Sequence, residues 1–181
     1  MSKIVYFIRH GESEANIKGV MAGSNDNSSL TELGKQQAKD TARNLKGIYF
    51  DLIVSSPMSR TLDTTKIIMN ELGIEKEIII KLEFIERDVG KFVGKPREAY
   101  FTFLAEGGET GESATDMQSR LRAGLRWLKE QDFENPLVIT HNGTIRMIRT
   151  VLEGLPAKDF TNIPKLRNGE YRKVDLELVT L

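Results

Sequence analysis

Both histidines of the sequence, His10 and His141, stand directly after a short apolar run. Arginines lie near such runs as well, because Arg9 precedes His10 and Arg60 follows the apolar residues 51–54. In parallel α/β sheets, ligands bind beyond the carboxyl ends of the strands. If these runs are neighbouring strands, two imidazoles and two guanidinium groups converge in one cationic crevice.

Phosphate is the ligand that fits such a crevice, because a guanidinium presents a planar pair of donors to phosphate oxygens. A helix start at Ser56-Pro57 would add free backbone N–H groups and the positive end of the helix dipole. Gly11, and Asn142-Gly143 after the second histidine, would let the backbone approach an anion closely.

The chemistry that these residue types suggest is phosphoryl transfer. A neutral imidazole nitrogen can attack phosphorus and form a phosphohistidine, which water then hydrolyses. An acidic side chain at the pocket mouth would protonate the leaving alkoxide, and the surrounding cations would stabilise the phosphoryl charge. No group of His, Asp and Glu has the spacing of metal ligands, so we predict no metal and no cofactor. A histidine after a strand is usually structural when taken alone. The joint occurrence of these residues at strand ends favours the functional interpretation.

The elements that would position these residues alternate between strands and helices. Continuous apolar runs are typical of strands buried on both faces, and they occur at 3–8, 51–54, 76–80 and 136–140. Caps and apolar stripes predict helices over 32–46, 57–72 and 143–153, and from a cap at Ser113 to about 131. This alternation implies an α/β fold with a mostly parallel sheet covered on both faces.

Some segments carry more specific expectations. Thr31 is expected to cap the first long helix, whose inward face would carry Leu33, Ala38, Ala42 and Leu45. The period-two pattern of 172–180 predicts a half-exposed strand at an edge of the sheet. Residues 14–29 and 95–112 are rich in glycine and polar residues, and we expect them to be irregular binding loops or lids.

Length and composition bound the remaining alternatives. The 181 residues predict one domain, residues 1–181. Lys+Arg and Asp+Glu both number 26, and this balance argues against a nucleic-acid partner. The absence of cysteine excludes disulfides, a thiolate nucleophile and cysteine-based metal sites. No apolar run is long enough to cross a membrane, and the first apolar run is too short for a signal peptide. We therefore expect a soluble, cytoplasmic protein with no membrane partner, and its oligomeric state stays open.

Several motifs together resemble the histidine phosphatase (phosphoglycerate mutase-like) superfamily. The short Arg-His-Gly sequence at 9–11 is a weak signal by itself, but further segments match in order along nearly the whole chain. These segments are 8–13 with Asn16, 30–38, 55–61, 86–94, 111–113 and 140–146. One departure is Asn142, which stands where the family often has glycine.

The resemblance implies a fold and a set of roles. The fold is a three-layer α/β/α sandwich with a mostly parallel sheet and one antiparallel edge strand. His10 would be the phosphorylated nucleophile, and Glu86 would donate and accept the proton. The phosphoryl oxygens would be held by Arg9, Arg60 and His141, with Asn16 as a further donor. Gly23 falls where family members bring backbone to the substrate.

The resemblance leaves more than one activity open. Glu86-Arg87 resembles the pattern of bisphosphate-dependent mutases, but Val89 stands where they have a tyrosine. No Arg or Lys occurs between Arg97 and Arg120, so their paired arginine is missing. These departures favour a phosphomonoesterase, a histidine acid phosphatase-type hydrolase acting on a small phosphorylated metabolite. The alternatives are a cofactor-dependent phosphoglycerate mutase and a non-catalytic phospho-ligand binding or regulatory protein.

A group of cations follows the predicted acid. These residues are Arg87, Lys91, Lys95 and Arg97. They would either contact an acidic group of the substrate or lie on an ordinary solvated surface.

Overall fold

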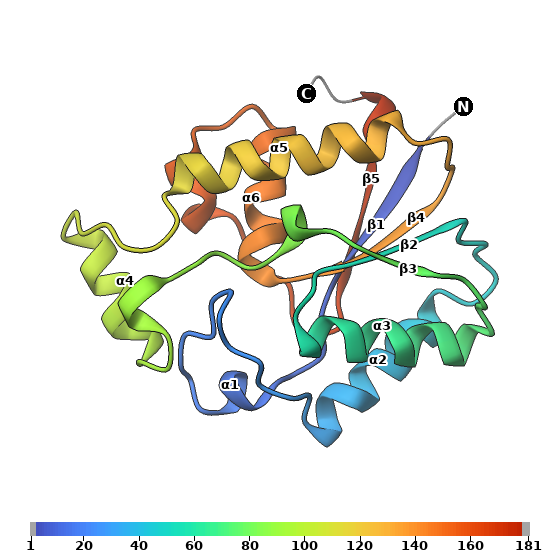
Figure 1. Ribbon diagram of the computed structural model, residues 1–181, viewed down its shortest axis with the longest axis horizontal. Helices are drawn as coiled ribbons and strands as arrows, with labels where there is room; N and C mark the ends of the chain where they lie inside the picture. The colour runs from blue at the N-terminus through green and yellow to red at the C-terminus, as the bar shows by residue number, and fades with distance from the viewer. Residues whose placement is uncertain (1–2, 179–181) are drawn as a thin grey trace.

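A five-stranded sheet forms the centre of the computed structural model, which describes residues 3–178 (Figure 1). Its strands are β1 (Ile4–Arg9), β2 (Leu52–Ser55), β3 (Ile78–Ile80), β4 (Pro136–Thr140) and β5 (Tyr171–Asp175). Their order across the sheet is β3-β2-β4-β1-β5. β5 pairs antiparallel to β1 at one edge, and the other three pairings are parallel. This confirms the expected α/β fold and its antiparallel edge strand.

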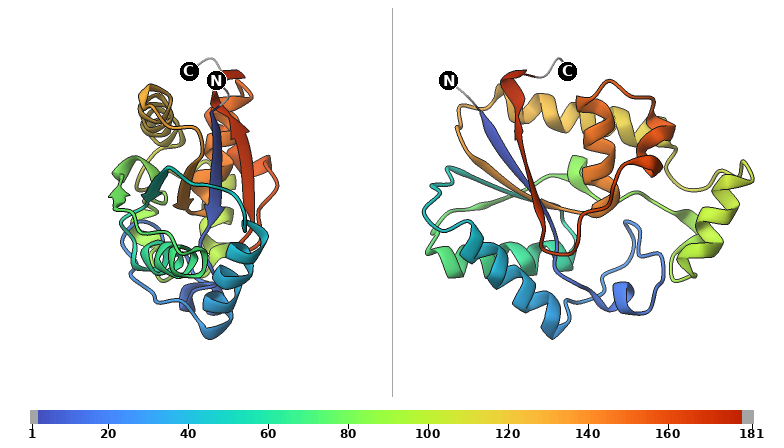
Figure 2. Two further views of the ribbon diagram at one scale, coloured as in Figure 1. Left: turned by 90° about the vertical axis from the view of Figure 1, so that its right-hand side faces the viewer. Right: turned by 180° about the vertical axis from the view of Figure 1, so that it is seen from behind.

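Helices cover both faces of the sheet. Successive side chains of each strand point to opposite faces, so alternate residues of one strand pack with different helices. Val5 and Phe7 of β1 pack with α5 (Ala114–Glu130) and α6 (Asn142–Leu152). Tyr6 and Ile8 pack with α2 (Glu32–Asn44) and α3 (Ser59–Leu72) on the opposite face. The three layers are visible in Figure 1, with α5 and α6 above the sheet and α2 and α3 below it, and again from the side in Figure 2.

α2 begins as expected and buries Ala38, Ala42 and the following Leu45 as predicted, but not Leu33. The Thr31 hydroxyl accepts a hydrogen bond from the Gly34 N–H at 3.0 Å, which confirms the cap. Leu33 is 54% exposed, so its expected inward position is wrong. Gly34 faces inward in its place, because a Cβ there would lie 2.0 Å from the Glu12 carbonyl oxygen. A Cβ built at Gly11 would lie 2.2 Å from the Gly34 carbonyl oxygen, so the packing of α2 requires glycine at this position as well.

α3 begins later than the sequence indicates. Ser56 still belongs to the sheet hydrogen bonding, since its N–H donates to the Ile139 carbonyl at 3.0 Å. The helix therefore starts at Ser59 with Met58 as its N-cap, and the expected start at Ser56-Pro57 is wrong. Its buried face is largely polar, and threonine hydroxyls there bond to carbonyls one turn back.

Both segments predicted to be irregular contain helices. The first holds the short α1 (Glu14–Ile17), and the second holds α4 (Arg97–Ala105). α4 packs on a small aromatic cluster apart from the main core, which explains why its pattern does not read as a core-facing stripe. α4 lies at one end of the molecule in Figure 1.

Short 3-10 helices complete the described elements. They are Leu82–Phe84, Gly90–Phe92, Ala157–Asn162 and Leu176–Leu178. The last one corrects the predicted edge strand, which ends at Asp175, because Leu176 turns into the core with no exposure while Leu178 is 84% exposed. Residues 179 and 180 of that prediction lie outside the described residues.

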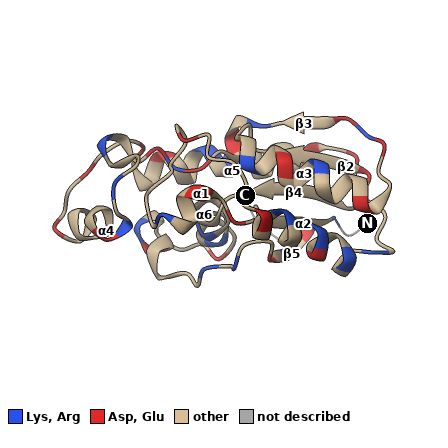
Figure 3. Ribbon diagram, turned by 90° about the horizontal axis from the view of Figure 1, so that it is seen from below, with Lys and Arg blue, Asp and Glu red and all other residues tan. Residues whose placement is uncertain are grey.

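Charges of both signs are distributed over the outer helices. Figure 3 shows acidic and basic residues interspersed along α2 and α3, and some of them form ion pairs, such as Lys35 with Glu32 at 2.7 Å. Between residues 3 and 178, none of the helices combines the length and the apolar character that a membrane crossing requires.

Candidate active site

The two histidines meet at the carboxyl ends of β1 and β4. These strands pair in parallel with Arg9 opposite Thr140, so the next residue of each chain segment is a histidine. The ring centroids of His10 and His141 lie 5.2 Å apart, with their planes at 67°. The His10 N–H donates to the Thr140 carbonyl at 3.0 Å, which ties the two strand ends together.

The surroundings of the His10 ring decide which nitrogen is reactive. Nδ1 lies 2.7 Å from the Gly11 carbonyl oxygen, and a carbonyl only accepts, so Nδ1 carries the proton. Nε2 therefore keeps its lone pair. The ring is buried, and this burial, followed by the charge of Arg60, lowers the pKa of His10 well below its usual value. The neutral imidazole with a free Nε2 is the form that can attack phosphorus.

Ser56, the residue directly after β2, holds the ring of His141. Its Nε2 lies 2.8 Å from the Ser56 hydroxyl oxygen, so Ser56 orients the ring and does not open a helix. Burial, and then the charge of Arg60, lowers the pKa of His141 well below its usual value. Its Nδ1 is buried with no hydrogen-bond partner among residues 3–178. A buried polar atom of this kind is costly unless a ligand satisfies it.

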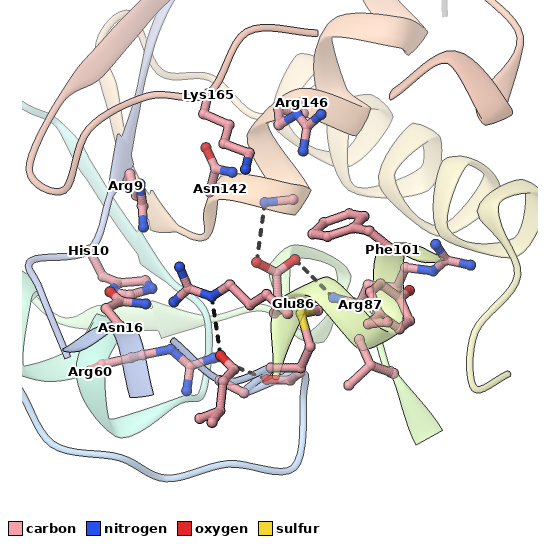
Figure 4. A pocket seen from close by; sticks show the side chains of 18 of the residues that line it. Arg9, His10, Asn16, Arg60, Glu86, Arg87, Phe101, Asn142, Arg146 and Lys165 are labelled. Atoms are coloured by element: carbon pink, nitrogen blue, oxygen red, sulfur yellow. Dashed lines mark hydrogen bonds between the residues drawn. The ribbon is translucent and has the colours of Figure 1, made fainter. Parts of the chain in front are cut away.

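Arg9 and Arg60 flank His10, as Figure 4 shows. Arg9 donates through Nη1 to the Leu166 carbonyl at 2.6 Å, while its Nε is buried and unpartnered within the described chain. Arg60 donates to the Asp26 carbonyl at 2.6 Å and to the Gly23 carbonyl at 3.0 Å. Burial lowers the pKa of Arg9 to about 10, which leaves it charged at neutral pH. Both guanidinium groups are thus charged and fixed in place by backbone oxygens.

The 14–29 segment closes one side of the site. At Gly23, φ is +60° and a Cβ would lie 2.9 Å from the Val89 side chain, so glycine is required at this point of the wall. The Asn16 Oδ1 accepts from the Ser13 N–H at 3.2 Å and from the Asn168 Nδ2 at 2.9 Å, which leaves the Asn16 amide group free to donate into the cavity. Asn168 also donates to the His10 carbonyl at 3.1 Å, a role that the sequence motifs do not indicate.

Glu86 lies in the wall of the same cavity, half-buried. Its two carboxylate oxygens accept from the Arg87 N–H at 3.0 Å and the Gly143 N–H at 3.2 Å. A Cβ at residue 143 would lie 2.4 Å from the Glu86 Oε1, so the glycine makes room for this carboxylate. The Thr144 hydroxyl donates to the Ile85 carbonyl at 2.9 Å and fixes the preceding backbone.

Asn142 lines the cavity and also has a structural contact. It is the first residue of α6, and no non-glycine residue in 3–178 has a positive φ, so the turn needs no left-handed backbone here. Its Oδ1 accepts from the Leu166 N–H at 3.1 Å. Asn142 therefore ties α6 to the chain segment that also binds Arg9.

These residues surround a cavity of about 140 Å³. The predicted residues that line it are Arg9, His10, Asn16, Gly23, Arg60, Glu86, Arg87 and Asn142. His141 is fully buried and not part of the lining, and its ring centroid lies 5.2 Å from that of His10. Of the cations left open, Arg97 also lines the cavity, whereas Lys91 and Lys95 lie outside it against aromatic rings.

Sequence reasoning missed part of the lining. Arg146 lies in the 140–146 segment, but the sequence predicts no role for it. No sequence pattern points to the other lining residues Tyr100, Phe101, Phe160 and Lys165. Tyr100 and Phe101 come from α4, and Phe160 and Lys165 come from the segment after α6, so only the folded chain brings them to the strand ends. No group of three or more His, Cys, Asp or Glu side chains in residues 3–178 could hold a metal ion.

Comparison with known proteins gives matches over most of the chain. The model of the histidine phosphatase superfamily (branch 1) matches residues 5–178. A 2,3-bisphosphoglycerate-dependent phosphoglycerate mutase from Thermoplasma acidophilum is 37% identical over 116 residues, which cover 64% of the chain and 57% of that protein. This chain therefore matches less than two thirds of that relative's length. A Hydrogenobacter thermophilus protein that carries a phosphoserine phosphatase name is 30% identical, over 97% of the chain and 90% of that protein.

A solved structure shares the fold. The crystal structure of the alpha-ribazole phosphatase from Shigella flexneri superposes with a TM-score of 0.85 at 22% identity, covering 95% of this chain and 90% of that one. The similarity confirms the architecture of a mostly parallel sheet with one antiparallel edge strand, flanked by helices.

Proposed function

Since the chain belongs to the histidine phosphatase superfamily, we propose that it is a metal-independent phosphomonoesterase that acts on a small phosphorylated metabolite through a phosphohistidine on His10. One observation carries the proposal. His10 is neutral with an unbonded Nε2, and two nitrogens of residues that flank it, Arg9 Nε and His141 Nδ1, are buried without partners among residues 3–178. Phosphoryl oxygens are the acceptors that would satisfy both nitrogens while phosphorus faces His10.

The first half of the reaction transfers the phosphoryl group to the enzyme. The lone pair of His10 Nε2 attacks phosphorus, a P–N bond forms, and the ester P–O bond breaks. The leaving oxygen takes a proton from the carboxylic acid of Glu86 and departs as an alcohol. Arg9 and Arg60 stabilise the charge on the phosphoryl oxygens, and the fixed orientation of both groups means that little reorganisation is needed.

The second half returns the enzyme to its starting state. Water attacks the phosphohistidine, the Glu86 carboxylate accepts its proton, and the P–N bond breaks to release inorganic phosphate. The two backbone N–H groups that bond Glu86 hold the carboxylate in one place for both steps. A cavity of about 140 Å³ suits a small ester, since an apolar cavity of about 150 Å³ holds a molecule the size of benzene.

The second candidate is a phosphoglycerate mutase. Arg87 follows Glu86 and lines the cavity, and a relative of 37% identity carries that name. In such an enzyme, the phosphohistidine returns its phosphoryl group to a second hydroxyl of an acidic substrate and not to water.

The experiment that separates these candidates measures two products in one assay. The purified protein is incubated without added metal with a panel of phosphomonoesters and with 3-phosphoglycerate plus bisphosphoglycerate as primer. Free phosphate without formation of 2-phosphoglycerate supports the hydrolase, and interconversion with little free phosphate identifies a mutase. Binding without either product would favour the non-catalytic alternative. Strong inhibition by a chelator would contradict metal independence.

A further inference from the structure

Four cations line the cavity beyond the residues given to the phosphoryl group. They are Arg87, Arg97, Arg146 and Lys165. The proposed reaction gives none of them a role, although a single dianionic phosphoryl group is already matched by Arg9 and Arg60.

Backbone oxygens, and not carboxylates, fix these guanidinium groups. Arg87 donates to the Glu112 carbonyl at 2.7 Å, Arg97 to the Val20 carbonyl at 3.2 Å, and Arg146 to the Ile163 carbonyl at 2.7 Å. None of them forms an ion pair with an acidic side chain of residues 3–178.

Glu86 is the acidic side chain in the lining of this cavity. A carbonyl oxygen orients a guanidinium without neutralising it, so the cavity keeps an excess of positive charge that an incoming anion can match.

Lys165 is held over the mouth of the cavity by its own loop. The loop is fixed before and after Lys165, because Arg146 binds the Ile163 carbonyl and both Arg9 and Asn142 bind Leu166. Figure 4 shows Lys165 and Arg146 directed into the cavity from the same side.

The ammonium group of Lys165 makes no hydrogen bond or ion pair in the described chain, and it lies 5.6 Å from the centre of the Phe101 ring. Burial, and then the charges of Arg146 and Arg97, lowers the pKa of Lys165. The positive charges of Lys165, Arg146 and Arg97 repel one another, and an anion placed between them would offset this repulsion.

Tyr100 adds a neutral donor to the same region. Its side chain reaches the cavity from α4 and is 2% exposed, and its hydroxyl proton has no acceptor among residues 3–178. Burial raises the pKa of Tyr100, so the hydroxyl keeps its proton at neutral pH. A buried donor without an acceptor is rare in a folded protein and points to a ligand that supplies one.

From these contacts we propose that Lys165, Arg97 and Tyr100 form a second anion subsite, so that the substrate carries a second anionic group, a carboxylate or a further phosphate, on the alcohol side of the ester. The proposal rests on the phosphomonoesterase function proposed above and narrows its substrate class. Arg87 and Arg146 complete the positive surroundings of this subsite.

The first test compares esters that differ by one charged group. O-Phosphoserine and phosphoethanolamine differ by a carboxylate, and 3-phosphoglycerate and glycerol 3-phosphate differ by a carboxylate in place of a hydroxymethyl group. We expect the acidic member of each pair to have a kcat/KM about tenfold to a hundredfold higher, the range of a charged hydrogen-bonded contact. 2,3-Bisphosphoglycerate against 3-phosphoglycerate tells whether the subsite prefers phosphate or carboxylate.

The second test assigns this preference to residues. Lys165→Met and Tyr100→Phe should each lower the acidic-to-neutral ratio of kcat/KM by about tenfold, mainly through a higher KM for the acidic ester. Lys91→Met is the matched control, because it removes the same charge from a nearby exposed site outside the cavity. Its ratio should stay at the wild-type value.

The outcomes separate the two proposals. Release of phosphate from neutral and acidic esters at equal kcat/KM overturns the second subsite and leaves the phosphomonoesterase standing. An equal fall in the ratio for Lys165→Met and Lys91→Met also overturns it, since a general charge effect would then explain the preference. No phosphate release from any ester overturns the proposed function itself.

Discussion

The proton on His10 Nδ1 has a fixed place, because the Gly11 carbonyl accepts it, and this leaves Nε2 as the nitrogen that faces a substrate. His10 is the residue that the proposed mechanism phosphorylates. We therefore expect His10→Ala to abolish phosphate release from every phosphomonoester. The measurement is free phosphate over time, with the thermal midpoint of the variant as a control for folding. Activity near the wild-type level would contradict the phosphohistidine mechanism.

Glu86 should matter in proportion to how much the leaving group needs a proton. We expect Glu86→Gln to slow hydrolysis of an alkyl phosphate by about 10²–10⁴-fold, because the amide can still bond to the backbone but cannot donate a proton to an alkoxide. Nitrophenyl phosphate should lose far less, since nitrophenolate leaves without protonation. The ratio of the two rates in wild type and variant is the readout, and equal losses would remove Glu86 from the acid role.

Among single residues, the sequence predicts which ones from the strand ends belong to the site, but not which ones from later segments do. His10 and His141 follow apolar runs, and the physics of parallel sheets then brings them together. Lys165 reaches the cavity because side chains hold its loop through backbone oxygen and N–H groups, and such contacts leave no pattern in the sequence.

At the scale of elements, the contact between Gly34 of α2 and the backbone of Gly11 and Glu12 is the most constrained packing near the site. We expect Gly34→Ala to destabilise the protein by at least about 1–3 kcal/mol, because the new Cβ would overlap a backbone oxygen that cannot rotate away. Urea denaturation would measure the loss.

The neighbouring Leu33→Ala variant is the control for this prediction. Leu33 is 54% exposed, so its replacement should change the free energy of unfolding by less than about 0.5 kcal/mol. A large loss for Leu33→Ala together with a small one for Gly34→Ala would show that Leu33, and not Gly34, faces inward in the first turn of α2.

The elements themselves were predictable to different degrees. Buried strands and the caps at Thr31 and Ser113 follow from local patterns, and the structure confirms them. The start of α3 does not, because a backbone hydrogen bond from Ser56 to Ile139, far away in the sequence, extends the sheet by one residue. The sequence did not predict α4 for a related reason, since its aromatic residues pack with Val89 and Phe92 and not with the main core.

For the whole molecule, the two buried histidines make stability depend on pH. Both have a folded pKa well below the unfolded value of about 6.5, so the unfolded chain binds more protons and the free energy of unfolding falls as pH drops through that value. We expect wild type to lose up to about 1.4 kcal/mol more than His141→Asn between pH 7.5 and pH 5.5. Urea denaturation at the two pH values gives this double difference, and equal losses would show that His141 takes up a proton as readily when folded.

The use of neutral carbonyl oxygens to hold the arginines of the cavity has a consequence for how fast a substrate arrives. The molecule has no net charge, yet the cations that line the pocket outnumber its acidic side chain, Glu86, so the field of the pocket should attract anions from a distance. Added salt shortens the reach of that field, from about 30 Å at 0.01 M to about 8 Å at 0.15 M. Ionic strength should therefore slow the capture of a phosphate ester, seen as a lower kcat/KM, while the turnover of an ester already bound continues at the same rate.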